Sequence, residues 1–186
     1  MMIKGTAIRA RVEYLRERFG DEGLERLVGA LSPEYGRVLR EAILISKWYP
    51  GELNDEILGT AERLFGREDG KLCRELGAAS CELGMRTVYS NLAQTDDIGR
   101  ALTRFTSVLW KNYYDEGWCD GRQVGEGHVR LELFAKLEKD WTCHIIAGFV
   151  EAALRIWGVS HCHVGFSPPR LGTLDEPASV FEFHWE

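Results

Sequence analysis

The chain has 186 residues, of which 45% are hydrophobic and 28% are charged. This is an ordinary globular balance, and the length suits one domain of roughly 100–200 residues, so we expect a single domain, 1–186. The net charge of −6 and the lack of a Lys/Arg run argue against nucleic acid as a partner. Charged residues interrupt every stretch of about 18 residues, so we expect no membrane span.

The first two thirds of the chain show helical spacing. Val12, Leu15 and Phe19 predict one apolar helix face that ends at Gly20, and short helices follow before and after Ser32-Pro33. The segment 43–50 is β-branched and aromatic, and Pro50 disfavours helix at the residue before it. We expect an extended link there that buries Trp48.

Three further helices are expected at about 52–66, 71–92 and 96–114. The second contains Gly77, Ala78, Ala79 and Gly84. Glycine inside a helix costs about 1 kcal/mol relative to alanine, so we expect another backbone to pass close to this helix. It is the predicted centre of the fold.

After Gly117 the pattern changes to strands. Residues 129–133 alternate between apolar and charged side chains, and residues 161–166 and 178–185 read as two more strands. An apolar helix at 140–157, ended by Gly158, lies between them. The sequence predicts an α+β fold with N-terminal helices packed on a small C-terminal antiparallel sheet with one inserted helix.

The chain contains an odd number of cysteines and no pair with CxxC spacing. A secreted disulfide scaffold would be shorter and richer in cysteine. Reduced, mostly buried thiols in a cytoplasmic protein are expected at Cys73, Cys81, Cys119, Cys143 and Cys162.

Several segments together carry a family resemblance: residues 3–27, 48–50, 74–89, 109–117 and the terminal FEFHWE. They resemble a myxobacterial domain-of-unknown-function family of small proteins. That family in turn resembles vinyl-reductase-type domains, TRAPP trafficking-complex subunits and heme nitric-oxide-binding domains. The resemblance implies helices on a small antiparallel sheet, a homodimer, and an interior that can hold an apolar ligand.

Two departures from these families bear on the cofactor. Many vinyl-reductase-type domains end with a cysteine pair, whereas Ser179 stands at the place of the last cysteine here. The heme nitric-oxide-binding domains carry a Tyr-x-Ser-x-Arg motif and a mid-chain histidine. No tyrosine here has Ser and Arg at those spacings, and no histidine precedes His128. The sequence therefore argues against heme and leaves the cofactor unknown.

One polar cluster is a candidate metal site. If the last two strands pair, alternation brings His161, His163, Glu182 and His184 to the same face. Three imidazoles and a carboxylate can form a zinc-type ligand set. A solvent-facing polar stripe explains the same pattern, because strand spacing alone does not aim four ligands at one point. We therefore assign no metal and keep these residues as candidates.

We assign no catalytic residue, because the sequence lacks a nucleophile elbow, a phosphate loop, HExxH and a dinucleotide fingerprint. Three functions remain: a non-enzymatic ligand-binding or sensory domain, a dimeric protein-interaction module that scaffolds or regulates a protein partner, and a metal-dependent enzyme. The first leads, and it implies an apolar pocket for a hydrophobic small molecule. Its expected lining is Leu76, Ala79, Leu83, Phe149 and Phe166.

Overall fold

The computed structural model describes residues 1–87, 90, 95, 97–137, 139–170 and 175–186, without the side chains of Phe105 and Ser107. Its helices and strands form an α+β fold, as predicted. In chain order they are β1 (Met2–Lys4), α1 (Gly5–Ala30), α2 (Pro33–Arg40), β2 (Trp48–Pro50), α3 (Gly51–Phe65), α4 (Lys71–Arg86), α5 (Ile98–Tyr113), β3 (Trp118–Gly125), β4 (His128–Phe134), α6 (Trp141–Ile156), β5 (Cys162–Phe166) and β6 (Ser179–Trp185).

The main sheet has four antiparallel strands in the order β3-β4-β6-β5. The Gly125–Gly127 turn joins β3 to β4, with Gly127 at a φ of 64°, and a register shift interrupts the β3–β4 pairing between Gln123 and Gly125. The last two strands pair with each other, and α6 is inserted between β4 and β5. The expected hairpin and inserted helix are therefore both present.

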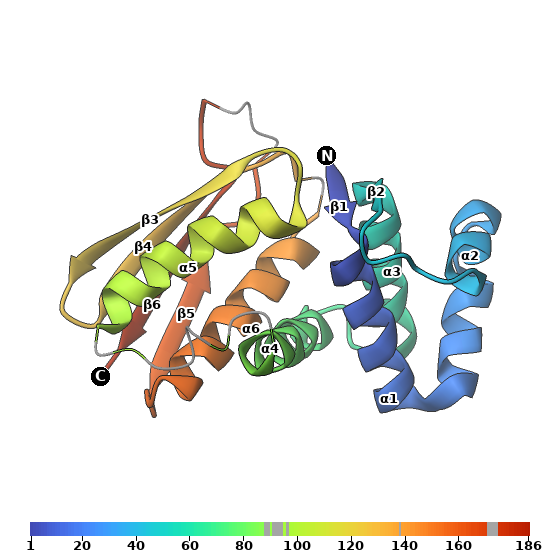
Figure 1. Ribbon diagram of the computed structural model, residues 1–186, viewed down its shortest axis with the longest axis horizontal. Helices are drawn as coiled ribbons and strands as arrows, with labels where there is room; N and C mark the ends of the chain where they lie inside the picture. Colours follow the sequence, from blue (N-terminus) through green and yellow to red (C-terminus); the bar gives the residue numbers. More distant parts are fainter. Residues whose placement is uncertain (88–89, 91–94, 96, 138, 171–174) are drawn as a thin grey trace.

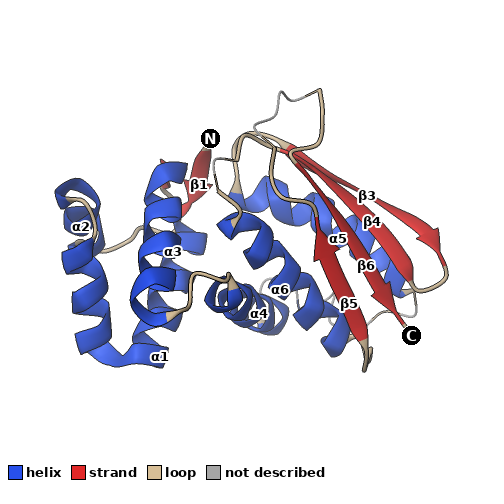
Figure 2. Cartoon of the chain, turned by 180° about the vertical axis from the view of Figure 1, so that it is seen from behind, coloured by secondary structure: helices blue, strands red, loops and turns tan. Residues whose placement is uncertain are grey.

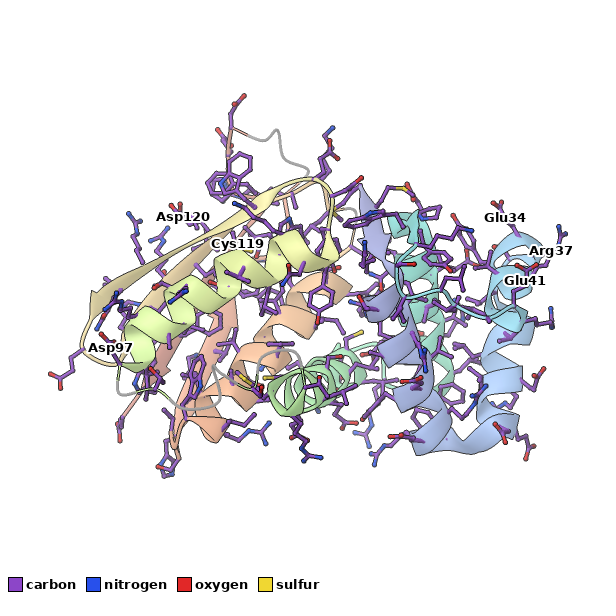
Figure 3. All side chains as sticks on the ribbon, viewed as in Figure 1. Glu34, Arg37, Glu41, Asp97, Cys119 and Asp120 are labelled. Carbon is purple, nitrogen blue, oxygen red and sulfur yellow. The ribbon has the colours of Figure 1, made fainter. Side chains whose placement is uncertain are left out.

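The helices form layers on one side of this sheet. Figure 1 shows α5 and α6 lying against the same face, with α4 beside α6 and the α1–α3 group beyond α4. Figure 2 shows the same arrangement from behind, and no helix of the described chain covers the opposite face of the sheet. The charged side chains of Glu34, Arg37 and Glu41 lie at the end farthest from the sheet (Figure 3).

The first helix is divided by Gly20, whose φ of 73° lies in the left-handed region that glycine adopts readily. The predicted break at Gly20 is thus confirmed, although helix continues on both sides. In the part of α1 that precedes Gly20, the buried face includes Ile8, Arg11 and Leu15. This face is rotated by about one residue from the predicted stripe of Val12, Leu15 and Phe19. An arginine at a buried helical position could not be read as core from hydrophobic spacing.

A two-stranded sheet joins the N-terminus to the 43–50 segment. Ile3 pairs with Tyr49, and both side chains are buried, whereas Trp48 is only half-buried. The expectation that this link buries Trp48 is therefore wrong. Alternation along β2 turns Tyr49 inward instead, where its hydroxyl oxygen accepts a hydrogen bond from the Leu44 backbone N–H at 3.0 Å.

The central contact of the fold joins α4 and α6 through glycines. A Cβ at Gly77 would lie 2.1 Å from the Ile145 carbonyl oxygen, and a Cβ at Gly148 would lie 2.0 Å from the Arg74 carbonyl oxygen. No side chain fits at either place. The prediction that another backbone passes close to Gly77 is confirmed, and α4 and α6 form one tightly packed pair.

A continuous cluster of buried residues connects both ends of the molecule. It runs from Ile3 and Leu15 in the N-terminal part to Val150 in α6 and Phe183 in β6. Among the residues described, no helix is both long and apolar enough to cross a membrane.

Candidate functional site

An apolar cavity of about 80 Å³ lies where α5 faces α6 and α4. Its wall consists almost entirely of carbon atoms, and aromatic rings of α5 and α6 supply much of it. The lining residues are Arg11 of α1, Ser80 of α4, Thr106, Leu109, Trp110 and Tyr113 of α5, Tyr114 at the end of α5, Cys119 of β3, Leu131 of β4, and Ile145, Ile146, Phe149 and Val150 of α6.

The α5 side of the wall follows from helical spacing. Thr106, Trp110 and Tyr113 recur at intervals of four and three residues, so one face of α5 looks into the cavity. The Trp110 ring stacks on Tyr114 at 4.1 Å, and its Nε1 donates to the Glu116 carbonyl oxygen at 2.9 Å. These contacts hold Trp110, which is 3% exposed, in a fixed position at the cavity.

Arg11 is the one cation among the described lining residues. It is 4% exposed, and its Nη1 has no hydrogen-bond partner. A buried donor without an acceptor is costly, so Nη1 is a candidate contact for an anionic or polar group of a ligand. Arg11 and Glu62 both act on the pKa of Cys73, in opposite directions. The Glu62 Oε1 accepts the Cys73 backbone N–H at 3.0 Å, while its Oε2 is buried without a hydrogen-bond partner.

Cys119 lies on β3 beneath α5, while the neighbouring Asp120 is exposed on the other face (Figure 3). Burial raises the pKa of the Cys119 thiol well above its usual range, and the nearby Cys143 adds to the rise. The thiol is therefore protonated at neutral pH and acts as a small apolar group in the wall. Thr106, which lines the cavity as well, has its hydroxyl hydrogen-bonded within α5, because it donates to the Leu102 carbonyl oxygen at 3.0 Å.

The residues expected to line a pocket do not gather in one place. Phe149 lines the cavity, and Leu76 is fully buried in the adjoining core. Ala79 and Leu83 instead border a second, more polar hollow of about 330 Å³ between α4 and α1, where Leu83 is 50% exposed. Phe166 packs edge-on against His144, with 4.9 Å between ring centroids.

Two signals in the sequence mark lining residues that those expectations missed. The period of Thr106, Trp110 and Tyr113 marks a continuous face of α5, and Cys119 is the inward residue of a strand that starts at Trp118. Arg11 carries no such signal, because a charged residue between apolar ones reads as solvent-exposed. Its place at the cavity is a property of the assembled fold.

The open face of the sheet brings histidines from three strands into one row. His128 of β4 pairs in register with His184 of β6, and His184 pairs with His163 of β5. The His128 Nε2 lies 2.7 Å from Glu182 Oε2. Of the four candidate ligands from the sequence, Glu182 and His184 are brought together, His163 is one strand away, and His161 precedes β5 and contacts Ser160 instead. His128 is the member that sequence reasoning missed.

No model of a known protein family matches the chain, and no curated protein matches its sequence. The match to the myxobacterial family is therefore without support. The likeness to vinyl-reductase-type and TRAPP proteins remains an expectation from the sequence.

Solved structures do match, over nearly the whole length. One from work on heme distortion in the H-NOX family has a TM-score of 0.76 at 13% identity, covering 98% of this chain and 95% of that one. An H-NOX protein from K. algicida, solved with unliganded Fe(II), gives 0.74 at 12% identity, with 98% and 96% covered. A single-residue variant of T. Tengcongensis H-NOX gives 0.70 at 13% identity, with 98% and 97% covered.

These matches correct the expectation about heme. The sequence argued against heme because a ligand motif was missing, yet the structures that share this fold are described as heme proteins. The pattern of buried residues specifies a fold, and the fold is shared here at 12–13% identity. A ligand motif consists of only a few residues on that fold, so its absence does not exclude the fold. Of the families named from the sequence, the heme nitric-oxide-binding one is confirmed at the level of architecture: the chain has the fold of H-NOX domains.

Proposed function

We propose that the protein is a non-enzymatic sensory domain that binds an apolar small molecule in the cavity between α5 and α6, and that heme is the first candidate. The observation that carries this proposal is the cavity itself: an aromatic and aliphatic wall with one buried cation, Arg11, whose Nη1 has no hydrogen-bond partner. Heme is a flat apolar molecule with carboxylates, which suits both parts of that wall. The shared fold with H-NOX structures supports the choice.

The apolar wall suits a porphyrin in its chemistry, but the cavity is too small to hold one as it stands. Ligand sites commonly measure about 300–1,000 Å³, so a cavity of about 80 Å³ has to widen before it admits one. No histidine is among the lining residues described. The hydroxyls of Ser80 and Thr106 donate to carbonyl oxygens of their own helices, so the remaining oxygen and sulfur groups of the wall are those of Tyr113, Tyr114 and Cys119. Tyrosine and cysteine thiolate both occur as heme ligands. The raised pKa of Cys119 disfavours its thiolate, which leaves the two tyrosines as the better candidates.

The packing suggests how the cavity widens. The helices α4 and α6 are locked together by Gly77 and Gly148, whereas α5 packs mainly on β3 and β4. A ligand wedged between them therefore displaces α5 rather than α6. Because α5 rests on the sheet, this displacement reaches β3 and β4, which gives a sensory domain its output surface. A bound heme would supply an iron at which a diatomic gas can bind.

The test is a titration of the purified chain with hemin. We expect a Soret band of bound heme at one equivalent and quenching of tryptophan fluorescence that is smaller in Trp110→Phe. Arg11→Met should weaken binding on the order of tenfold or more, since hydrogen bonds to charged groups contribute about 1.5–3 kcal/mol. His184→Ala, on the open face, controls for hemin held at the surface. A wild-type chain whose Soret spectrum stays that of free hemin excludes heme, and equal affinity in Arg11→Met excludes the role of Arg11.

The dimeric interaction module is the second candidate, and exposed apolar side chains favour it. Leu44 and Ile45 are 58% and 50% exposed, and Trp118 on the open sheet face is 40% exposed. Sedimentation at micromolar concentration decides whether the chain is the homodimer that was expected from the sequence. A monomer would remove this candidate. Five free cysteines, four of them buried, support a cytoplasmic location for either function.

A further inference from the structure

We propose that the open face of the main sheet carries a site for a divalent metal ion of the zinc type, with His128, Glu182 and His184 as its ligands. One ligand atom from each of these residues lies within 4.8 Å of the other two. The site is separate from the apolar cavity, which lies on the helix-covered side of the sheet, and its existence does not depend on heme.

Strand register builds this group. His128 and His184 are direct partners on β4 and β6, and their rings stack with centroids 3.9 Å apart. Glu182 precedes His184 by two residues, so its side chain leaves the same face of β6. β6 pairs with β4 on one side and with β5 on the other, and His128 is held by its pairing with His184, although the β3–β4 pairing shifts register beside His128. A metal ion would therefore meet a largely preorganised backbone.

The ligand atoms are close to the spacing that a metal requires. Zinc binds imidazole nitrogen at about 2.0–2.1 Å and carboxylate oxygen at about 2.0–2.2 Å, which places two tetrahedral ligands about 3.4 Å apart. The His128 Nε2 and Glu182 Oε2 lie 2.7 Å apart and have to separate slightly. These side chains are partly exposed, so a small rotation of each is inexpensive. Two imidazoles and one carboxylate leave a fourth position for water.

The surrounding charges determine how tightly the ion binds. Arg130 on β4 reaches Glu182, with Nη1 3.6 Å from Oε1, and so places a positive charge beside the site. This charge repels a cation and competes for the carboxylate. His163, the register partner of His184, lies on the other side and brings a further imidazole within one strand spacing. We therefore expect roughly micromolar affinity, weaker than that of a closed structural zinc site.

The experiment uses the full chain, titrated with Zn²⁺ against a chromogenic chelator and with Co²⁺ for its absorption spectrum. One equivalent should bind, and His184→Ala or His128→Ala should each weaken binding by at least about tenfold, since losing even an indirect partner of a metal commonly costs about 10–100-fold. His161→Ala is the matched control, because His161 is exposed and outside the group. Arg130→Gln should tighten binding about threefold, because it removes the neighbouring charge.

Three results would overturn the site: no Zn²⁺ binding by the wild-type chain below roughly 100 µM, unchanged affinity in both His184→Ala and His128→Ala, or a Co²⁺ spectrum with thiolate charge-transfer bands. The last would assign the ion to a cysteine such as Cys162, which is only half-buried. The circular dichroism of each variant shows whether its fold is intact, and the two histidine variants on different strands provide independent readings.

Discussion

Replacing Gly77 by alanine tests the α4–α6 contact on which the core and one cavity wall depend. The new Cβ would lie 2.1 Å from the Ile145 carbonyl oxygen and 3.0 Å from the Phe149 backbone nitrogen, where ordinary contact begins at 3.4 Å. Neither atom belongs to a flexible side chain, so the two helices have to separate. Overpacking of this kind costs about 1–3 kcal/mol.

Helix propensity works in the opposite direction and sets the net effect. Alanine is favoured over glycine inside a helix by about 1 kcal/mol, so we expect Gly77→Ala to destabilise the fold by up to about 2 kcal/mol. In a chain of this size each kcal/mol lowers the melting temperature by about 2–4 °C. Gly29→Ala is the control, because Gly29 lies within α1 and a Cβ there meets nothing within 4 Å. That variant gains propensity without a clash and should be as stable as the wild type or more stable.

Thermal and urea denaturation followed by circular dichroism measure both variants. A melting temperature of Gly77→Ala at or above that of the wild type, with Gly29→Ala unchanged, would refute the close backbone contact. Hemin titration of Gly77→Ala gives a second reading. Separation of α4 from α6 moves Ile145 and Phe149, which line the cavity, so its affinity should change along with its stability.

Three further predictions concern titration, thiol reactivity and cooperativity. Burial lowers the pKa of His144 below its usual value. Because the unfolded chain takes up this proton near pH 6.5, the contribution of His144 to the free energy of unfolding should be complete above that pH and be lost as the pH falls through the folded pKa. Urea denaturation at several pH values should show a weaker pH dependence in His144→Asn. Burial also raises the pKa of all five thiols, and Cys162 is the only one of them that is not fully buried. A thiol reagent should therefore label Cys162 first and the other four only when the chain unfolds. The variant Cys162→Ser should lose the first phase of labelling. We propose that residues 1–186 are one domain, and calorimetry should then show a single transition; two separated transitions would divide the α1–α3 group from the rest.

Local signals in the sequence predicted much of the fold. Gly20, Gly127 and Gly158 each have a positive φ where a break, a turn and a helix end were expected. The alternation at 129–133 and the paired strands at the C-terminus were also confirmed, because such patterns depend on near neighbours. The helix expected to extend to residue 92 is described as α4 only to Arg86, and residues 88–89 and 91–92 lie outside the described part of the chain.

The candidate sites were harder to predict because they are assembled from distant segments. The cavity combines Arg11, Ser80 and Phe149 from three helices, and no spacing along the chain relates them. The histidine row required the partner of β6 to be known: His128 and His184 lie far apart in the sequence and become neighbours only through strand order. The missing heme motif was misleading for a related reason, since it described a few ligand positions and carried no information on the cavity that the helices enclose.

The irregular pairing near the end of β3 affects how molecules of this protein can meet. β3 is an edge strand of the sheet, and unpaired edges invite a strand from a second chain. Here the register shift between Gln123 and Gly125 distorts that edge, and Asp120 and Arg122 add exposed charge along it. A further strand added there would meet the irregular end of β3 and would lie against these charges. The β3 edge is therefore poorly suited to extending the sheet from one molecule into the next, which disfavours growth into fibres through this edge.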